Sequence, residues 1–449
     1  AVNQKSAIAF EHIHWYSNVV KYLKQDGNFK TRNLDGEKFH VLSEIMQHFK
    51  TNCYELSDKP ETLEIQQQII KHIEGVLVGP ITVFMGMNGM FHKYFMEASF
   101  SADEFHEDAE NFDKILDFFS QLGWFTKKNN TYSFTEKGFF YAKRASAYGV
   151  TVSYIPTLRH IDTLIFGDFS NLRTTSSKSP EIHVDRVMNV WGSGGAHSAY
   201  FKKIDEIIID IFNKPLDKQP KGILDMGCGN GAFLIHLFDV IENHTLRGKH
   251  LEEHPLFLVG ADYNKEALKV TRANLIKADI WAKVIWGDIG DPKQLDKDIY
   301  NDYAIHLSEL LNVRTFLDHN RTWNEPQPEN ISTNSLSSGA FVFKGVRLAN
   351  NKVEASLKEH LSKWKPFVKK YGLILIELHT IHPSLTAKNL GKTAATAYDA
   401  THGFSDQYIL ELDAFLKILD EIGLKSSAKH FSRFPDSDLA TVSIHYVKE

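Results

Sequence analysis

Cysteine is scarce in this sequence of 449 residues, since only Cys53 and Cys228 occur. Two cysteines cannot supply a disulfide scaffold for a chain of this length, and so low a count is typical of a reducing compartment. A surplus of positive charge is also missing, because 51 lysines and arginines face 56 acidic residues and the net charge is −5. Proteins that bind nucleic acids normally carry a basic surplus or stripe, so we expect no nucleic-acid partner.

Long apolar runs are missing as well. We find no stretch of about 18 apolar residues and no basic-then-apolar signal at the N-terminus, so we expect a cytoplasmic protein without a membrane partner. Apolar residues make up 43% of the chain and charged residues 24%, which is ordinary for globular proteins. The length exceeds that of a usual single domain, so two domains are expected.

The N-terminal part of the chain has helical periodicity. Apolar residues recur at three- and four-residue steps in segments 41–50 and 64–79. Segment 111–145 predicts an amphipathic helix, a glycine stop and two short strands joined by an Asn-Asn turn, which is the order of a winged helix. Such a unit either binds DNA or serves in packing and dimerisation. Because the wing carries only three lysines, we favour packing.

A polar linker over residues 171–182 separates a predicted helical, winged-helix-like domain at 1–180 from a second domain at 181–449. From Lys221 onward, short apolar runs alternate with helical segments, which predicts a parallel sheet with crossover helices. The predicted strands are 222–227, 256–263, 282–288, 303–311 and 372–381, followed by a closing antiparallel pair at 424–434 and 441–447. The fold class is therefore α/β, with a Rossmann-like core of seven strands.

A glycine-rich loop follows the first of these strands in "LDMGCGNGAFLIHLF". Gly227, Gly229 and Gly231 allow a tight turn and a close approach to a ligand, and the following helix offers its first N–H groups. Asp225 precedes them on the strand. A carboxylate at this place would repel the pyrophosphate of a nicotinamide cofactor, so the pattern better suits a ligand with an ammonium group.

With this D-x-G-x-G-x-G pattern, residues 190–449 resemble class I S-adenosylmethionine-dependent methyltransferases. The resemblance implies that Asp225 and the three glycines contact the methionine part of the cofactor. It also implies that Asp262 accepts hydrogen bonds from the ribose hydroxyls, beside Tyr263, and that Asp288 and Ile289 meet the adenine. The alternative interpretation is that these acids only cap turns.

A second glycine cluster, "WGSGGAHSAYF" at 191–201, lies just before the predicted core. Ser193 and His197 could bind the carboxylate of the methionine part there, as side chains of a lid that reaches the cofactor. The alternative is a flexible hinge.

Polar residues are concentrated after the predicted fourth strand, in "ELLNVRTFLDHNRTW". An arginine here could hold a carboxylate or a phosphate, and a histidine could accept a proton. We take Asn312, Arg314 and His319 as candidate catalytic residues. The alternative is a capped surface helix in which Asp318 and Arg321 pair.

A candidate metal site lies around the fifth long strand and the loop that follows it. His379 ends that strand, and His402 and Gln407 lie in and after the loop, in "HGFSDQY". Two imidazoles and one amide oxygen leave coordination positions open and suit iron, manganese or cobalt better than structural zinc. The alternative is that Ser405 or Asp406 caps the next helix and that His402 is incidental.

Three segments, "GSGGAHSAYF", "NVRTFLDHNR" and "AYDATHGFSDQY", are similar to those of the metal-dependent C-methyltransferases of apratoxin-type polyketide loading modules. The resemblance implies methylation of the α-carbon of a malonyl group on acyl carrier protein, a mononuclear metal such as iron or manganese, and an N-terminal domain that forms a lid. It assigns the metal to His379, His402 and Gln407, with His382 and Asp406 as rivals. Two other functions stay open: a metal-free O-methyltransferase for a small hydroxylated substrate, and a non-catalytic winged-helix regulator.

Overall fold

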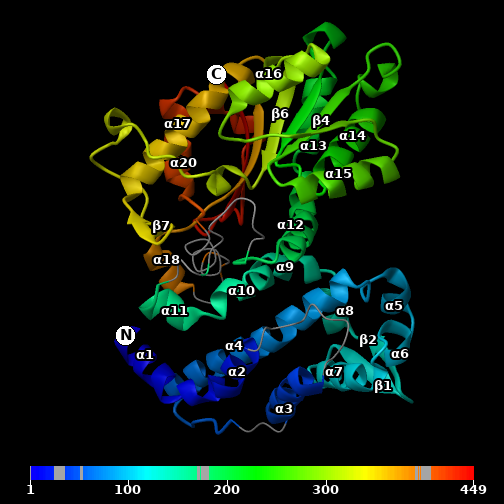
Figure 1. Ribbon diagram of the computed structural model, residues 1–449, viewed down its shortest axis with the longest axis vertical. Coiled ribbons are helices and arrows are strands. Elements are labelled where there is room, and N and C mark those ends of the chain that lie inside the picture. The colour runs from blue at the N-terminus through cyan, green and yellow to red at the C-terminus, as the bar shows by residue number, and fades with distance from the viewer. Residues whose placement is uncertain are drawn as a thin grey trace. The chain divides into compact units, whose positions relative to one another are not determined.

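The structure is a computed structural model that describes residues 2–24, 36–50, 54–168, 182–389 and 406–449, together with residues 172, 393 and 395. It forms two compact units, Ala1–Ala196 and His197–Glu449 (Figure 1). The domain boundary predicted at 180/181 stays a prediction, because residues 173–181 lie outside the described ranges. The role of the N-terminal unit as a lid also stays a prediction.

The N-terminal unit is mostly helical, as predicted. Its longer helices include α3 (Gly36–Lys50) and α4 (Pro60–Met87), which contain the two segments with helical periodicity. The other described elements of this unit are α1 (Val2–Glu11), α2 (Ser17–Lys24), α5 (Lys93–Glu97), α6 (Ala102–Phe105), α7 (Ala109–Gln121), β1 (Phe125–Lys128), β2 (Thr131–Phe134), α8 (Glu136–Ala142), α9 (Ala145–Ser153), α10 (Ile155–Leu158), α11 (Ile161–Phe166) and the first part of α12 (Arg186–Phe201).

The winged-helix prediction is confirmed in its order of elements. α7 ends before Gly123, which adopts a left-handed φ of 79°, and β1 and β2 pair as an antiparallel hairpin. Asn129 and Asn130, with φ of 48° and 62°, form the turn, because asparagine tolerates this region better than most residues. Lys127 of the wing is paired with Asp113 and Asp117 on α7, so its charge is already compensated within the unit.

α4 is the central helix of this unit. Ile69, Ile73, Leu77, Ile81 and Met85 recur every four residues, and all are buried in its aromatic-rich core. By length and composition alone, α4 is also apolar enough to cross a membrane. Half of the apolar window is buried by the protein itself, and buried core helices pass the same test, so this finding carries no membrane assignment.

The glycine cluster at 191–201 lies within the helix α12. A Cβ atom at Gly192 would lie 2.7 Å from backbone atoms of Gly149 in α9, so the two helices approach backbone to backbone at these glycines. The interpretation as a hinge stays open, because the division between the two units, after Ala196, falls within this helix. The side chains of Ser193 and His197 lie outside the described part of the structure, and their predicted contacts stay predictions.

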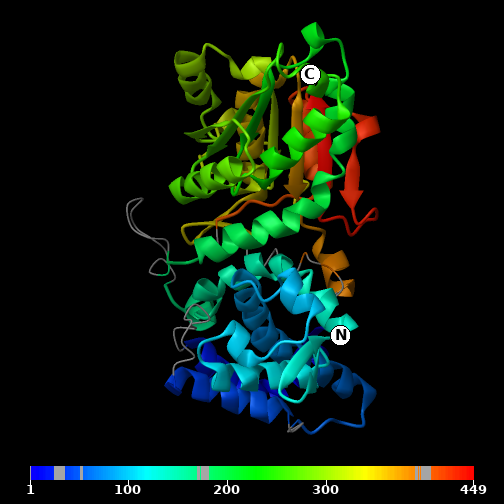
Figure 2. The same cartoon turned by 90° about the vertical axis from the view of Figure 1, so that its right-hand side faces the viewer.

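The C-terminal unit is built around one mixed sheet with the order β10-β12-β9-β6-β3-β4-β5 (Figures 1 and 2). The neighbouring strands β9, β6, β3, β4 and β5 are parallel, and β12 is antiparallel to β9, as predicted. The strands are β3 (Gly222–Met226), β4 (Phe257–Asp262), β5 (Lys283–Trp286), β6 (Leu310–Thr315), β9 (Leu373–Leu378), β10 (Lys425–Ser426), β11 (Ser432–Phe434) and β12 (Val442–Lys448). The segment predicted as one strand at 424–434 forms both β10 and β11, which each pair with β12, so the sheet has eight strands.

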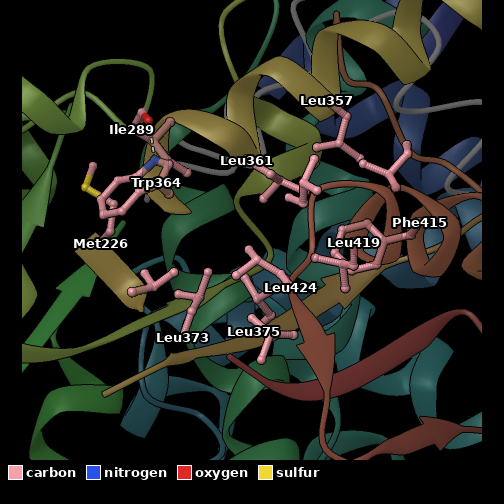
Figure 3. Packing of buried hydrophobic residues seen from close by; sticks show 14 of the residues in the cluster. Met226, Ile289, Leu357, Leu361, Trp364, Leu373, Leu375, Phe415, Leu419 and Leu424 are labelled. Carbon is pink, nitrogen blue, oxygen red and sulfur yellow. Dashed lines mark hydrogen bonds between the residues drawn. The ribbon is translucent and has the colours of Figure 1, made fainter. Parts of the chain in front are cut away.

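Helices cover both faces of this sheet (Figure 1). One face packs against α16 (Pro292–Tyr303), α17 (Asn350–Val368) and α20 (Leu412–Glu421), and the other against α13 (Asp205–Phe212), α14 (Ala232–His244) and α15 (Lys265–Lys277). On β9, Leu373 and Leu375 face the first layer while Ile374 and Ile376 face the second. Figure 3 shows the first layer, in which Leu373 and Leu375 lie below the α17 residues Leu361 and Trp364. Strands buried on both faces explain the continuous apolar runs in the sequence. Two smaller elements, the hairpin β7 (Phe341–Phe343) with β8 (Val346–Leu348) and the helix α18 (Pro383–Lys388), complete the unit.

Two predicted boundaries in this unit are wrong. The strand expected at 303–311 begins only at Leu310, because α16 continues to Tyr303 and a 3-10 turn occupies Leu307–Glu309. The helix expected directly after residue 406 begins at Leu412, and its N-cap is Glu411. The interpretation that Ser405 or Asp406 caps this helix is therefore wrong.

Candidate active site

The glycine loop connects β3 to α14, as predicted. Gly227, Gly229 and Gly231 have φ of 78°, 56° and 79°, a left-handed conformation that glycine adopts readily. A Cβ atom at Gly227 would lie 2.8 Å from the side chain of Leu317, which follows β6. The loop is thus in close contact with the segment that leaves the neighbouring strand. Strands β4 and β6 flank β3 on opposite sides, which makes this the switch point where ligands bind in open α/β sheets.

Asp225 is buried below this loop. Its carboxyl group is 1% exposed, and its Oδ1 atom accepts no hydrogen bond among the described residues. Burial and the nearby charge of Asp262 raise the pKa of Asp225 to about 8. An acid that is buried without a full set of partners is stabilised by a cationic ligand, so the residue fits the ammonium-bearing ligand expected from the sequence.

Asp262 ends β4 beside the glycine loop. Its Oδ2 atom accepts a hydrogen bond from the Gly229 N–H at 3.0 Å, and its Oδ1 atom accepts one from the Asn264 N–H at 2.8 Å. These bonds fix the carboxylate at the rim of the loop. The neighbouring Tyr263 is 60% exposed, and its ring centroid lies 5.4 Å from that of Trp286. Tyr263 follows β4 and Trp286 ends β5, so both side chains lie at the strand ends where a ligand would bind.

Asp288 and Ile289 follow β5. The Asp288 carboxylate accepts a hydrogen bond from the Gly290 N–H at 2.7 Å. Ile289 is buried, and its carbonyl accepts a bond from the indole N–H of Trp364 at 2.8 Å (Figure 3). The structure therefore brings Asp225, Asp262, Asp288 and the three loop glycines to the carboxyl ends of three adjacent strands, as the sequence predicted. This set of acids and glycines fits an ammonium, a vicinal diol and an adenine.

The segment after β6 is not a surface helix but a buried polar cluster. The 3-10 turn η6 (Asp318–Asn320) has Asp318 1% and His319 6% exposed. Asn312 lies within β6, and its amide Nδ2 donates to the carbonyls of Leu307 and Leu310 at 3.2 and 3.3 Å. Asn312 thus has a structural role in holding the strand, which argues against the catalytic role expected for it.

Glu377 on β9 holds this turn in place, a pairing that we did not predict from the sequence. The Nδ1 atom of His319 bonds to Glu377 Oε1, and the Glu377 carboxylate also accepts from the N–H groups of Asp318, His319 and Leu378. Because a carboxylate only accepts, Nδ1 carries the proton and Nε2 is the basic nitrogen of His319. A glutamate within an otherwise apolar strand was the one available signal, since buried acids are rare unless they are paired.

Charges in the cluster are balanced around Asp318. Its carboxylate lies 2.9 Å from Arg314 Nε and accepts a bond from His360 Nε2 at 3.0 Å. Burial alone would raise the pKa of Asp318, but Arg314 and His360 outweigh it and hold the pKa below its ordinary value. Burial lowers the pKa of His360, against the opposing effect of Asp318. Near neutral pH, the Asp318 carboxylate is therefore ionised and the His360 ring is neutral.

His379 is placed differently from the metal ligand expected for it. Its Nδ1–H faces the carbonyl of Leu410 at 3.1 Å, so Nε2 accepts from the Ser443 hydroxyl at 2.6 Å. Ser443 in turn accepts from His445 Nε2, also at 2.6 Å, and the Nδ1 atom of His445 accepts from Ser426. Burial lowers the pKa of His379 to about 4, so the ring is neutral. With both nitrogens engaged by the protein, His379 does not fit a metal ligand in this structure.

The other proposed ligands are only partly described. Gln407 is buried next to Tyr408, whose N–H donates to the His319 carbonyl at 2.7 Å, so this segment does reach the cluster. Of the rivals, His382 caps α18 through Ser384, and Asp406 accepts from the Lys344 N–H. His402 lies outside the described residues. Within the ranges that are described, no group of three or more His, Cys, Asp or Glu residues could hold a metal ion.

Sequence comparison supports both parts of this architecture. A family model described as the AprA MT2-like domain matches residues 181–445, and one described as the AprA winged helix domain matches residues 74–168. No curated protein matches the chain.

Solved methyltransferase structures are among those that match the chain. Human N-acetylserotonin methyltransferase, in a complex with SAM, matches with a TM-score of 0.50, 12% identity and coverage of 88% of this chain and 99% of that one. An O-methyltransferase family protein from Burkholderia thailandensis matches at 0.46 with 10% identity, over 85% and 98% of the two chains. The CurJ carbon methyltransferase matches at 0.36 with 15% identity, over 91% and 99%. At 12% identity, the match to human N-acetylserotonin methyltransferase shows a shared fold and no shared function.

Proposed function

The chain belongs to the AprA MT2-like methyltransferase family, and from that premise we propose that it methylates the α-carbon of a malonyl-type acyl group on acyl carrier protein. That it is a class I S-adenosylmethionine-dependent methyltransferase follows from the family and from the site at the strand ends. The choice of a carbon acceptor, the carrier protein and a cytoplasmic location are parts of the proposal.

The observation that carries the proposal is the buried pair of His319 and Glu377. A carbon acid becomes a nucleophile only when its α-proton is removed, so the reaction needs a positioned base. Glu377 fixes the ring and stabilises the positive charge that forms on it, and Nε2 is the atom that would take the proton. His319 follows β6 and Glu377 lies on β9, and Leu317, two residues before His319, borders the glycine loop. We propose that the base lies beside the predicted cofactor site.

The roles of the residues follow from this arrangement. S-adenosylmethionine, when bound, supplies a methyl group activated on a sulfonium. Asp225 and the glycine loop would hold its methionine part, Asp262 its ribose, and Asp288 with Ile289 its adenine. His319 Nε2 takes the α-proton, and the electron pair of the broken C–H bond forms the new bond to the methyl carbon. The electron pair of the methyl–sulfur bond stays on sulfur, and the proton on His319 is returned to solvent.

The proposal also includes one divalent metal, iron or manganese, bound by His402 and Gln407. Support comes from the resemblance of the segment around these residues to that of metal-dependent C-methyltransferases. His379 is not part of the proposed ligand set, because both of its nitrogens are engaged. Metal analysis of purified variants tests this assignment. We expect loss of metal from His402→Ala and Gln407→Ala and retention in His379→Asn, and full retention in the first two would remove them as ligands.

A second candidate function is O-methylation of a small hydroxylated substrate. The His319–Glu377 pair favours it as well, because such a base would also deprotonate a phenolic hydroxyl. The two functions differ in the acceptor. A carrier-bound acyl group is required by the first, whereas a free hydroxylated compound suffices for the second.

Intact-mass analysis of malonyl-carrier protein tests the proposal. The carrier is incubated with the enzyme, the methyl donor and iron or manganese, and parallel samples contain a chelator or the variant Glu377→Gln. We expect the mass of one added methylene group with the wild-type enzyme and a strong loss of it with Glu377→Gln. An unchanged carrier mass, together with methylation of a panel of phenols, would contradict carbon methylation in favour of the second function.

A further inference from the structure

The helix α17 is hydrogen-bonded to the loop that follows β5, at the predicted adenine site. Trp364 of this helix is 1% exposed, and its indole N–H donates to the carbonyl of Ile289 at 2.8 Å. The neighbouring Lys363 donates from Nζ to the carbonyl of Gly290 at 3.3 Å. Two consecutive residues of the helix therefore hold two consecutive carbonyls of the loop, and Figure 3 shows the indole nitrogen of Trp364 directed at Ile289.

The bond from Trp364 reaches the Asp288 carboxylate through a single peptide group. The carbonyl of Ile289 and the N–H of Gly290 belong to the same peptide, which is planar, so a donor that fixes the carbonyl also fixes the direction of the N–H. That N–H donates to Asp288 Oδ1 at 2.7 Å. This bond occupies Oδ1, and it orients the carboxylate so that Oδ2 is left for a ligand.

Trp364 is itself held in a fixed position. The guanidinium carbon of Arg314 lies over its ring at 4.8 Å, and the ring packs in the apolar layer between the sheet and α17. One turn earlier on the helix, His360 Nε2 bonds to Asp318 Oδ1 at 3.0 Å. Because both the ring and the helix are anchored, the fold determines where the indole N–H points.

In its predicted role, the Asp288 carboxylate recognises adenine by the amino group of the base. An amino group donates to a carboxylate, whereas hypoxanthine has a carbonyl oxygen at the same place, which a carboxylate repels. A site built to bond a donor rejects the analogue that lacks it, provided that the acceptor is held in the right direction. For Asp288, that direction depends on the peptide that Trp364 holds.

We propose that Trp364 is a positioning residue for donor recognition, which orients Asp288 toward the adenine amino group through the peptide between Ile289 and Gly290. Trp364 does not touch the donor in this role. It determines how well the enzyme distinguishes S-adenosyl ligands from S-inosyl ligands, in which the amino group is replaced by oxygen. The role concerns the methyl donor alone and is the same whether the acceptor is a carbon acid or a hydroxyl group.

The test measures the affinities of S-adenosylhomocysteine and of its deaminated analogue S-inosylhomocysteine by calorimetry, so no acceptor is required. Trp364→Phe keeps an aromatic ring and removes the indole N–H. We expect the wild type to prefer the adenosyl ligand, and Trp364→Phe to lower the adenosyl-to-inosyl ratio of affinities by about 5- to 20-fold, the effect of one buried hydrogen bond. Trp281→Phe, at a tryptophan that is 91% exposed, serves as the control and should keep the wild-type ratio.

Asp288→Asn separates an effect through the carboxylate from a general effect on the loop. If Trp364 acts through Asp288, Trp364→Phe should change the ratio little further once Asp288 is replaced, because two residues in one chain of hydrogen bonds are not additive. Fully additive changes overturn the inference, as does equal weakening of both ligands by Trp364→Phe. A wild type that binds both ligands equally well overturns it too, while the proposed function stands.

Gly290→Ala covers the case in which Trp364→Phe does not fold. A Cβ atom at Gly290 would lie 3.1 Å from Asp288 Oδ1, and its three nearest neighbours are all atoms of Asp288. The substitution therefore displaces the carboxylate and leaves the surrounding packing in place. We expect a lower adenosyl-to-inosyl ratio than in the wild type. An unchanged ratio would contradict the inference, because the peptide would then not determine what Asp288 recognises.

Discussion

Replacing Asp225 with asparagine should change how the stability of the free enzyme depends on pH. Asp225 lies below the glycine loop with its Oδ1 atom unmatched, and burial together with Asp262 raises its pKa from 3.8 to about 8. An acid whose pKa is raised in the folded state contributes stability that is fully present below pH 3.8 and is lost as the pH rises through about 8. Asparagine is nearly isosteric and does not titrate.

The window from pH 6.5 to 8 isolates this effect. The buried histidines 360, 379 and 445 all have lowered pKa values, so their contributions change mainly below the ordinary histidine value of 6.5, and what remains is common to the wild type and Asp225→Asn. One proton corresponds to about 1.36 kcal/mol per pH unit, so the wild type should lose about 2 kcal/mol of unfolding free energy across this window relative to Asp225→Asn.

The assay is urea unfolding of the free enzyme at several pH values, following the transition that the methyl donor shifts. Only the unit that binds the donor is stabilised by it, so this transition reports on the unit that contains Asp225. Saturating S-adenosylmethionine should remove the slope, because a cation beside Asp225 lowers its pKa. Parallel pH profiles for the wild type and Asp225→Asn would refute the reasoning, as would a slope that persists with the donor bound.

Three further predictions concern the base, the histidine relay and the helix contact. Glu377→Gln should lower kcat by about 100- to 10,000-fold while calorimetry shows unchanged donor affinity, and a small loss would show that His319 is not the base. His379→Asn keeps a donor toward the Leu410 carbonyl and should retain most activity in a steady-state assay, whereas His379→Gln should not; equal losses would show that the bond to Leu410 does not matter for the site. Gly149→Ala should destabilise the N-terminal unit in thermal unfolding by about 1–3 kcal/mol, because its Cβ would meet the backbone of α12. Gly75→Ala, with open space around its Cβ, should stabilise the same unit by about 0.5–1 kcal/mol, and similar shifts for the two would contradict the close helix approach.

The features that the sequence predicted correctly depend on local chemistry. Glycines with left-handed φ after a buried strand identify the cofactor loop, because few other residues adopt that turn. The Asn-Asn turn of the wing is likewise determined by the conformational tolerance of its own two residues. Alternation of apolar runs with amphipathic segments was enough to predict the parallel sheet and its closing antiparallel strand.

The features that it could not predict depend on partners far away in the chain. We expected Asn312 and Arg314 to follow the fourth strand as candidate catalytic residues, yet both lie inside β6, where the amide of Asn312 is buried and donates to backbone carbonyls. His379 suggested a metal ligand because it ends a strand, and only the sheet order reveals Ser443, 64 residues away, as its partner. The pairing of His319 with Glu377, 58 residues apart, is of the same kind. Periodicity and motif spacing carry no information about such contacts.

The position of the transferred methyl group tests the central claim most directly. A donor labelled with carbon-13 in its methyl group is incubated with the enzyme and malonyl-carrier protein, and the product is examined by carbon-13 NMR. A base at His319 that generates a carbon nucleophile predicts a methyl signal in the high-field region of carbon-bound methyl groups, which is absent with Glu377→Gln. A signal in the downfield region of oxygen-bound methyl groups would contradict carbon methylation.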